Sequence, residues 1–146
     1  MSTDDLVGRV LTAPDEYEVS RAKIREFAEA VGERSPVCHD VKAARAAGHA
    51  DLVAPPTFAV IPSFVGLRLV MEQIGAPLAA QVHGEQSFTH HRPIVAGDVL
   101  TSSAAAERIR SVAGNLFVTV SCQVTDAAGT PVTTARSVVV VRGAAA

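Results

Sequence analysis

Two stretches of the chain gather side chains that could move protons. The first is the loop from Glu33 to Asp40, which holds a carboxylate at Glu33 and an imidazole at His39. A loop can bring two such groups onto one substrate, where one acts as a base and the other as an acid. The same loop can also be interpreted as a solvated segment in which Glu33 and Asp40 are surface charges.

The second stretch runs from His83 to Pro93 and includes the adjacent residues His90 and His91. Neighbouring residues of a strand point to opposite faces, so these two imidazoles cannot bind one metal ion. An exposed polar strand face is the simpler interpretation. His49, which follows a glycine in a turn, is interpreted in the same way. We therefore expect neither a metal site nor a cofactor.

The two cysteines have different surroundings in the sequence. Cys122 lies on the apolar side of an alternating segment, which predicts a core residue. Cys38 lies in the polar loop and would be reactive only if nearby positive charge lowered its pKa. Two cysteines so far apart predict neither a disulfide framework nor a zinc site.

Composition excludes several classes of protein. The chain has 146 residues, and we expect residues 1–146 to form a single domain. Its net charge of -2, with no basic run, argues against nucleic acid binding. No stretch reaches roughly 18 uninterrupted apolar residues, and the first residues are polar and acidic, so we expect a cytoplasmic protein without a membrane span or signal peptide. With 25 alanines and 22 valines but only 4% aromatic residues, the core predicts a helix lying close against a sheet.

The first half of the chain predicts helices. After a brief strand over residues 17–19, a helix is expected to begin behind Ser20 and to end at Gly32. Its apolar face consists of Ile24, Phe27, Ala28 and Val31. A short helix is expected over residues 41–47. A long helix, apolar nearly all round and capped by Thr57, is expected to run to about Ile74.

The second half predicts strands. Alternating patterns and turn residues indicate four of them, Val82–His91, Val99–Ile109, Leu116–Val124 and Val132–Val141. The run from Ser137 to Val141 suggests a strand covered on both sides. The order indicates an α+β fold, in which an antiparallel meander curls around one buried helix.

Four segments, at residues 17–19, 23–28, 43–58 and 88–98, resemble the MaoC-like dehydratases. The similarity is closest to the FAS1-like, HadA-type subunits of (3R)-hydroxyacyl-ACP dehydratase. It extends from about Val7 to Arg142, and the string Ala-Pro-Pro-Thr-Phe at residues 54–58 is fairly specific. The resemblance implies a single hot-dog domain, an antiparallel sheet wrapped around a long central helix.

The resemblance also implies an activity, the reversible loss of water from a (3R)-3-hydroxyacyl thioester of CoA or acyl carrier protein. The family's active loop reads Gly-Asp-x-Asn-Pro-x-His, in which the Asp and His form the catalytic dyad. This chain matches at Gly32 and Pro36 and departs at three positions, Glu33 for Asp, Ser35 for Asn and Cys38 for His. We assign the carboxylate role to Glu33 and the imidazole role to His39, one residue beyond the family's position.

The substrate is expected to contact this loop and the start of the long helix. The contact residues implied by the resemblance are Ser35, Cys38, Pro56, Thr57 and Phe58. The thioester oxygen gains negative charge during the reaction, and backbone N–H groups at the helix start would stabilise it. Thr57 is the expected donor, because Pro55 and Pro56 have no N–H.

Three functions stay open at this level. In the first hypothesis, the chain is a dehydratase that acts alone or as one subunit of a homodimer or heterodimer with a second hot-dog chain. Alternatively, it is a non-catalytic subunit that shapes an acyl channel for a partner with the intact dyad. The third hypothesis is that the chain is an acyl-CoA thioesterase, and it rests on fold analogy alone. Dimerisation is expected in the first two, because a hot-dog sheet has an edge to be paired.

Overall fold

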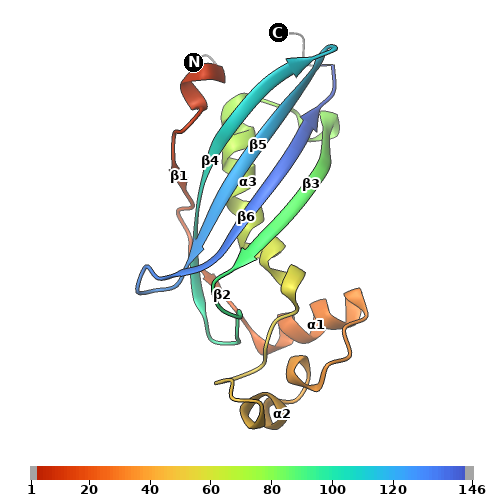
Figure 1. Ribbon diagram of the computed structural model, residues 1–146, viewed down its shortest axis with the longest axis vertical. Coiled ribbons are helices and arrows are strands. Elements are labelled where there is room, and N and C mark those ends of the chain that lie inside the picture. Colours follow the sequence, from red (N-terminus) through yellow and green to blue (C-terminus); the bar gives the residue numbers. More distant parts are fainter. Residues whose placement is uncertain (1–2, 144–146) are drawn as a thin grey trace.

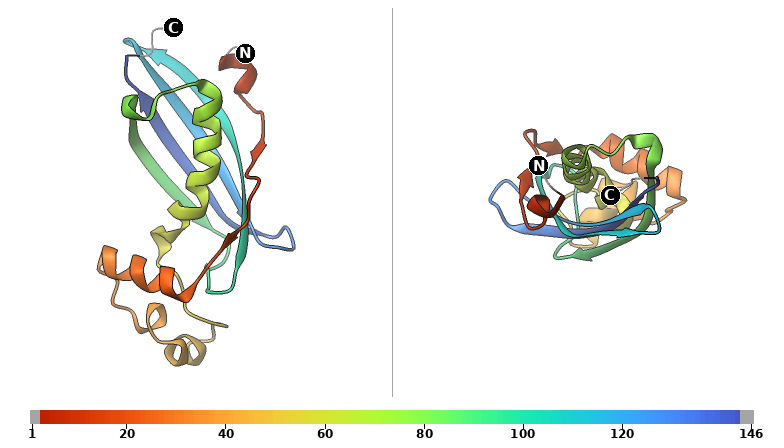
Figure 2. Two further views of the ribbon diagram at one scale, coloured as in Figure 1. Left: turned by 180° about the vertical axis from the view of Figure 1, so that it is seen from behind. Right: turned by 90° about the horizontal axis from the view of Figure 1, so that it is seen from above.

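The computed structural model describes residues 3–143 and consists of an antiparallel sheet with one long helix along its concave face (Figures 1 and 2). The strand order is β1-β4-β5-β6-β3, with β2 pairing β4 beside this path. The strands are β1 (Leu11–Thr12), β2 (Tyr17–Glu18), β3 (Gln81–His90), β4 (Val99–Val112), β5 (Asn115–Thr125) and β6 (Pro131–Val141). The helices are α1 (Arg21–Val31), α2 (Val41–Ala46) and α3 (Val60–Ile74). The α+β hot-dog architecture expected from the sequence is confirmed.

The four long strands lie where the alternating patterns predicted them, within a few residues. Their side chains divide as expected, since Val118, Val120, Cys122 and Val124 of β5 are all buried. On β6, however, Val138 and Val140 are only half-buried, because nothing in the described chain covers the convex face of the sheet there. The prediction that this strand is covered on both sides is therefore not met by the single chain.

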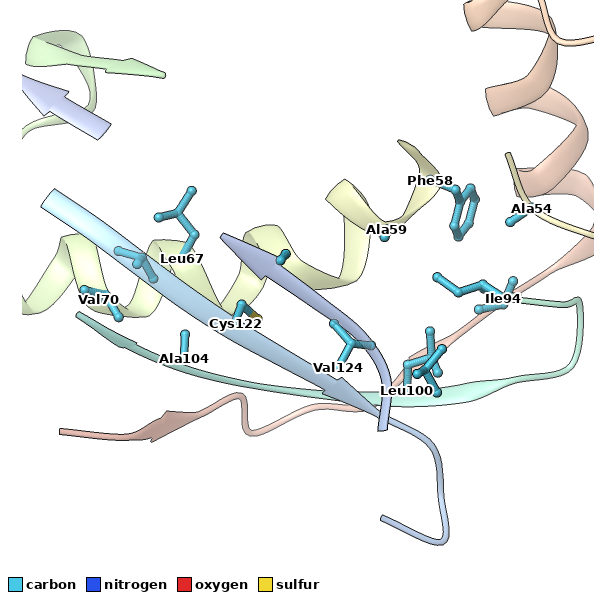
Figure 3. Packing of buried hydrophobic residues seen from close by; sticks show 14 of the residues in the cluster. Ala54, Phe58, Ala59, Leu67, Val70, Ile94, Leu100, Ala104, Cys122 and Val124 are labelled. Carbon is cyan, nitrogen blue, oxygen red and sulfur yellow. The ribbon is translucent and has the colours of Figure 1, made fainter. Parts of the chain in front are cut away.

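Small residues let α3 approach the sheet closely, as the composition predicted. A methyl group added at Gly66 would come within 2.9 Å of both the Ala104 Cβ atom and the Cys122 Sγ atom. Figure 3 shows Ala104 and Cys122 on the strands that face this helix. Real Cβ atoms do not come so close to their neighbours, so only glycine allows this helix-to-sheet distance.

The start of α3 differs from the prediction. A 3-10 turn over Pro56–Ala59 precedes the helix, and Thr57 lies inside this turn rather than at an N-cap. The N–H of Val60 instead bonds to the carbonyls of the turn. The reason is local, because consecutive prolines hold the entry in an extended form and the turn that follows leaves no capping position for Thr57. The predicted end is correct, with Gly75 in the left-handed conformation at φ 74°.

The stretch Pro56–Ile74 is also long and apolar enough, by length and composition, to cross a membrane. Here it is the helix packed along the concave face of the sheet, and 44% of it is buried inside the structure. A core helix meets the same criteria as a membrane span, so this stretch is explained by the fold.

The segment between β2 and α3, residues 20–56, forms a helical lobe beyond one end of the sheet (Figure 1). The Ser20 side chain accepts the Lys23 N–H, as its N-cap position predicted, and Ile24 and Ala28 bury the apolar face of α1. Val31, expected on the same face, is 51% exposed in the last turn. The expected short helix is α2, which begins behind Asp40.

An ion pair ties the two ends of the lobe together. Both oxygens of Asp51 accept hydrogen bonds from Arg21 at the start of α1, at 3.0 and 2.7 Å. The Arg21 guanidinium and the N–H of Leu52 lower the pKa of Asp51 to about 2. This contact fixes the loop that leads into the 3-10 turn and α3.

Candidate active site

A cavity of about 460 Å³ opens where the helical lobe meets the end of β3. Three segments form its wall, the loop of residues 33–38, the entry to α3 at residues 53–56 and the chain behind β3 at residues 90–94. Most of the wall is apolar, with the polar groups confined to a few positions. Its volume lies in the range of small-molecule sites, roughly 300–1,000 Å³.

The ending of α1 places Glu33 on this wall. Gly32 adopts the left-handed conformation at φ 73°, and the N–H groups of Gly32 and Glu33 bond back to the carbonyls of Glu29 and Ala28. This is the Schellman arrangement, which reverses the chain immediately after a helix. The Glu33 carboxylate then accepts the N–H of Ser35 at 2.8 Å. One carboxylate is thereby held at the cavity by the local sequence.

Cys38 occupies the cavity wall at the position where the family motif has histidine. It ends the 3-10 turn Pro36–Cys38 and is only 3% exposed. Burial raises the pKa of its thiol, and the negative charge of Glu33 raises it further. A reactive thiolate would need positive charge nearby, but the charged group next to Cys38 is the negative Glu33 carboxylate. Cys38 is therefore a packing residue of the wall.

His39 is turned differently from Cys38. Its Nε2 atom lies 2.7 Å from the backbone oxygen of Glu33, and its own backbone oxygen accepts a hydrogen bond from Arg25. His39 does not line the larger cavity. It borders a second hollow of about 260 Å³, which Glu33 also borders. The structure brings Glu33 and His39 together, but through the Glu33 backbone.

The expected contact residues divide into two groups. Ser35, Cys38 and Pro56 line the cavity, whereas Thr57 and Phe58 do not. Phe58 is fully buried, with its ring 5.4 Å from that of Phe27, so it belongs to the core instead. Thr57 follows the lining residue Pro56 in the chain and is exposed, and its backbone N–H makes no hydrogen bond within the described chain. Its role as a donor to the thioester oxygen stays a prediction.

The third wall of the cavity includes His90, His91 and Arg92. The sequence pointed to the two histidines and interpreted them as part of an exposed polar strand face, and both are exposed. It did not predict that this strand end forms part of a cavity. His90 faces the helix side of the sheet, where its Nδ1 atom lies 3.0 Å from the Oγ1 atom of the buried Thr133. The ring of His91 bonds instead to Thr134, so the two imidazoles do point to opposite faces. The alternation of the strand predicted that the two side chains point to opposite faces of the sheet. No signal in the sequence placed this strand end beside the loop of Glu33.

Arg92 is anchored rather than free. Its guanidinium makes two hydrogen bonds to Asp98, at 2.8 and 3.1 Å, and a third to Asp126 at 3.4 Å. The Asp98 side chain raises the pKa of Arg92, and Asp126 adds to the effect. This network joins the chain behind β3 to the turn between β5 and β6 and fixes the third wall.

Within residues 3–143, no three His, Cys, Asp or Glu side chains gather closely enough to hold a metal ion.

Cys122 lies away from the cavity, in the core between α3 and the sheet. Burial raises the pKa of its thiol to about 11, as suits the core position predicted for it.

Comparison with known proteins gives a consistent family. Residues 5–135 match the family described as FAS1-like, dehydratase domain region. A UPF0336 protein of Saccharopolyspora erythraea is 48% identical over 141 residues, covering 95% of this chain and 90% of that protein. A UPF0336 protein of Clavibacter michiganensis is 46% identical, with 95% of each chain covered.

Solved structures agree with this result. A structure named MaoC-like dehydratase superposes with a TM-score of 0.88 and 36% identity over 98% of this chain, which spans 44% of that longer chain. The HadBC (3R-hydroxyacyl-ACP dehydratase) complex of Mycobacterium tuberculosis gives a TM-score of 0.81 and 28% identity, with 93% of this chain and 97% of that chain covered.

Proposed function

The chain belongs to the FAS1-like dehydratase family, and from that premise we propose that it is the acyl-binding subunit of a (3R)-3-hydroxyacyl-thioester dehydratase. A second hot-dog chain would supply the catalytic Asp and His. The reaction converts a 3-hydroxyacyl thioester into a trans-2-enoyl thioester and water. A base removes the α-proton, and an acid protonates the departing hydroxyl.

The state of the family's dyad positions in this chain is the observation that carries the proposal. Cys38 is buried on the cavity wall with a raised thiol pKa, so it cannot replace the imidazole that the motif has there. The His39 ring, one residue later, bonds to the Glu33 backbone and lies off this wall. The cavity keeps one carboxylate, but the neighbouring imidazole of the motif is missing from it.

The rest of the cavity suits an acyl thioester. Its apolar wall matches a hydrocarbon chain, and the unpaired N–H of Thr57, next to the lining residue Pro56, suits a thioester oxygen that becomes negative during the reaction. An acyl-binding subunit needs these features and does not need its own dyad.

The free edge of the sheet supports a partner chain. β3 is the last strand in the order, so its ten residues present unpaired backbone groups on one side. Such an edge is a template for another strand. The cavity opens at the end of this same strand, so a chain paired with β3 would lie beside it. The similar HadBC structure is itself a complex of such dehydratase chains.

Hydration of crotonyl-CoA tests the proposal. The protein would be assayed alone and after co-expression with a hot-dog chain from the same organism that carries the full Gly-Asp-x-Asn-Pro-x-His loop. We expect the mixture to be at least about a hundredfold more active than the protein alone, because misplaced catalytic groups lose rates of that order. Equal activity of the isolated protein and the mixture would contradict the proposal.

Restoring the motif gives a control within this chain. The triple variant Glu33→Asp, Ser35→Asn, Cys38→His should gain hydratase activity without a partner. Glu33→Asp alone should not, because it leaves position 38 without an imidazole. Release of free CoA from acyl-CoA by the isolated protein would instead indicate a thioesterase.

The second candidate function is a dehydratase active by itself, with Glu33 as the carboxylate and His39 as the imidazole. It is favoured by the position of Glu33 on the walls of both hollows, next to the His39 ring. In that case Glu33→Gln and His39→Ala would each abolish hydration of crotonyl-CoA by the isolated protein. Activity unchanged by both substitutions would exclude this assignment.

A further inference from the structure

His90 is the cavity residue that the family motif and the proposed mechanism leave without a role. It lies at the end of β3 and lines the cavity together with the loop of Glu33, and its ring stacks on Phe88 with the two ring planes 19° apart. Strand register pairs it with Thr133, whose hydroxyl lies 3.0 Å from Nδ1. Two contacts therefore fix the plane and the rotation of this imidazole.

These contacts use one face and one nitrogen of the ring. Within the described residues the Nε2 atom has no hydrogen-bond partner, whereas the guanidinium of Arg92 is held by Asp98 and Asp126. His90 thus adds one oriented ring nitrogen to the few polar groups of a largely apolar wall, which include the Glu33 carboxylate. A wall of this kind fits a ligand that is mostly hydrocarbon and carries a few polar groups at defined places.

A hydroxyl is the ligand group that suits this ring in either of its neutral forms. If the Thr133 hydroxyl donates to Nδ1, then Nε2 carries the proton and donates; if Nδ1 donates to Thr133, then Nε2 accepts. A carbonyl oxygen satisfies only the first state. A hydroxyl, which both donates and accepts, satisfies either one.

We infer that His90 is a specificity-determining residue whose Nε2 atom binds the 3-hydroxyl group of the acyl chain. The cavity thereby prefers 3-hydroxyacyl thioesters over saturated acyl thioesters of the same length. This inference rests on the proposed function, since it requires an acyl thioester in the cavity.

Calorimetric titration with (3R)-3-hydroxyhexanoyl-CoA and with hexanoyl-CoA tests it on the full chain. We expect the hydroxylated thioester to bind about tenfold more tightly to the wild type, the effect of one hydrogen bond. In His90→Phe, which keeps an aromatic ring on Phe88 and removes both nitrogens, the two affinities should become equal. His83→Phe, on the same strand but outside the cavity, should keep the preference.

Two further variants separate binding from structural support. His90→Gln places an amide near the position of Nε2 and should keep most of the preference. His90→Asn reaches only the position of Nδ1, so it should keep the contact with Thr133 and lose the preference. Thermal melts identify any variant that fails to fold, and the remaining variants then decide the question.

The outcomes distinguish the two proposals. Binding of both thioesters with a preference that His90→Phe and His90→Asn leave unchanged would overturn the role of His90 and leave the acyl-binding function standing. Equal binding of both thioesters to the wild type would have the same meaning. Binding of neither thioester would overturn the acyl-binding function and the inference with it.

Discussion

The sheet with α3 and the helical lobe of residues 20–56 contribute to one buried core but are shaped by different interactions. Between α3 and the sheet, the fit is set by the volumes of small side chains, with Gly66 against Ala104 and Cys122. In the lobe, the chain path is set by end groups and charges, such as the cap at Ser20, the turn at Gly32 and the pair of Arg21 with Asp51.

The difference explains how this chain can depart from the loop motif that it resembles and keep the family's fold. The departures at residues 33, 35 and 38 fall in a loop whose path depends on the glycine and proline that the motif retains. Changing a loop side chain leaves these turns intact. A change between α3 and the sheet must instead move a helix or a strand.

Phe58 joins the two regions, and its removal should have the largest effect on stability. It is fully buried at the start of the long helical segment, with its ring against Phe27 of α1 and Tyr17 of β2. Phe58→Ala should lower the free energy of unfolding by about 3–5 kcal/mol, measured in urea. Phe64→Ala on α3, whose side chain is 48% exposed, is the matched control. Equal losses for both variants would contradict the joining role.

Gly66→Ala tests the close approach of α3 to the sheet. The added methyl would meet the Ala104 Cβ and Cys122 Sγ atoms at 2.9 Å, so we expect a loss of about 1–3 kcal/mol. Alanine is otherwise the better helix former by about 1 kcal/mol, so the sign of the change is informative. Adding Cys122→Ala should recover part of the loss in urea unfolding. A Gly66→Ala variant more stable than the wild type would show that the helix has room to move.

Asp51→Asn tests the charges of the lobe and should have the smallest effect, a decrease of a few degrees at most in Tm at neutral pH. The pKa of Asp51 is lowered to about 2 from an ordinary value of 3.8. Its stabilisation is therefore complete above about pH 4 and is lost as the pH falls toward 2. As the pH is lowered through this range, the Tm of the wild type should fall by more than the Tm of Asp51→Asn, which has no carboxylate to protonate at this position. Parallel curves for the two proteins would contradict the prediction.

Local signals in the sequence were sufficient for most of the fold. The alternation of the strands, the cap at Ser20 and the left-handed glycines at 32 and 75 each act within a few residues, and the structure has them where they were predicted. The prediction that Thr57 caps α3 was wrong. The preference of Thr57 for an N-cap position competes with the two prolines before it and with the 3-10 turn that they favour.

The candidate site depended more on the tertiary structure. The sequence identified the loop and Glu33, because Gly32 fixes the chain reversal that follows α1. It could not place the His39 ring, whose direction depends on contacts with the Glu33 backbone and Arg25. It noted His90 as part of an exposed strand face but could not place it at the cavity, because His90 lies more than fifty residues from Glu33 and His39 in the chain.

Residue types and local spacing thus determined which elements form, how close α3 could lie to the sheet, and that the loop of residues 33–38 departs from the MaoC-like motif that it resembles. Only the packing of the lobe against the end of β3 decided which side chains share the cavity. Helices, strands and caps are governed by interactions between near neighbours in the chain. A cavity between distant segments is governed by where those segments finally lie.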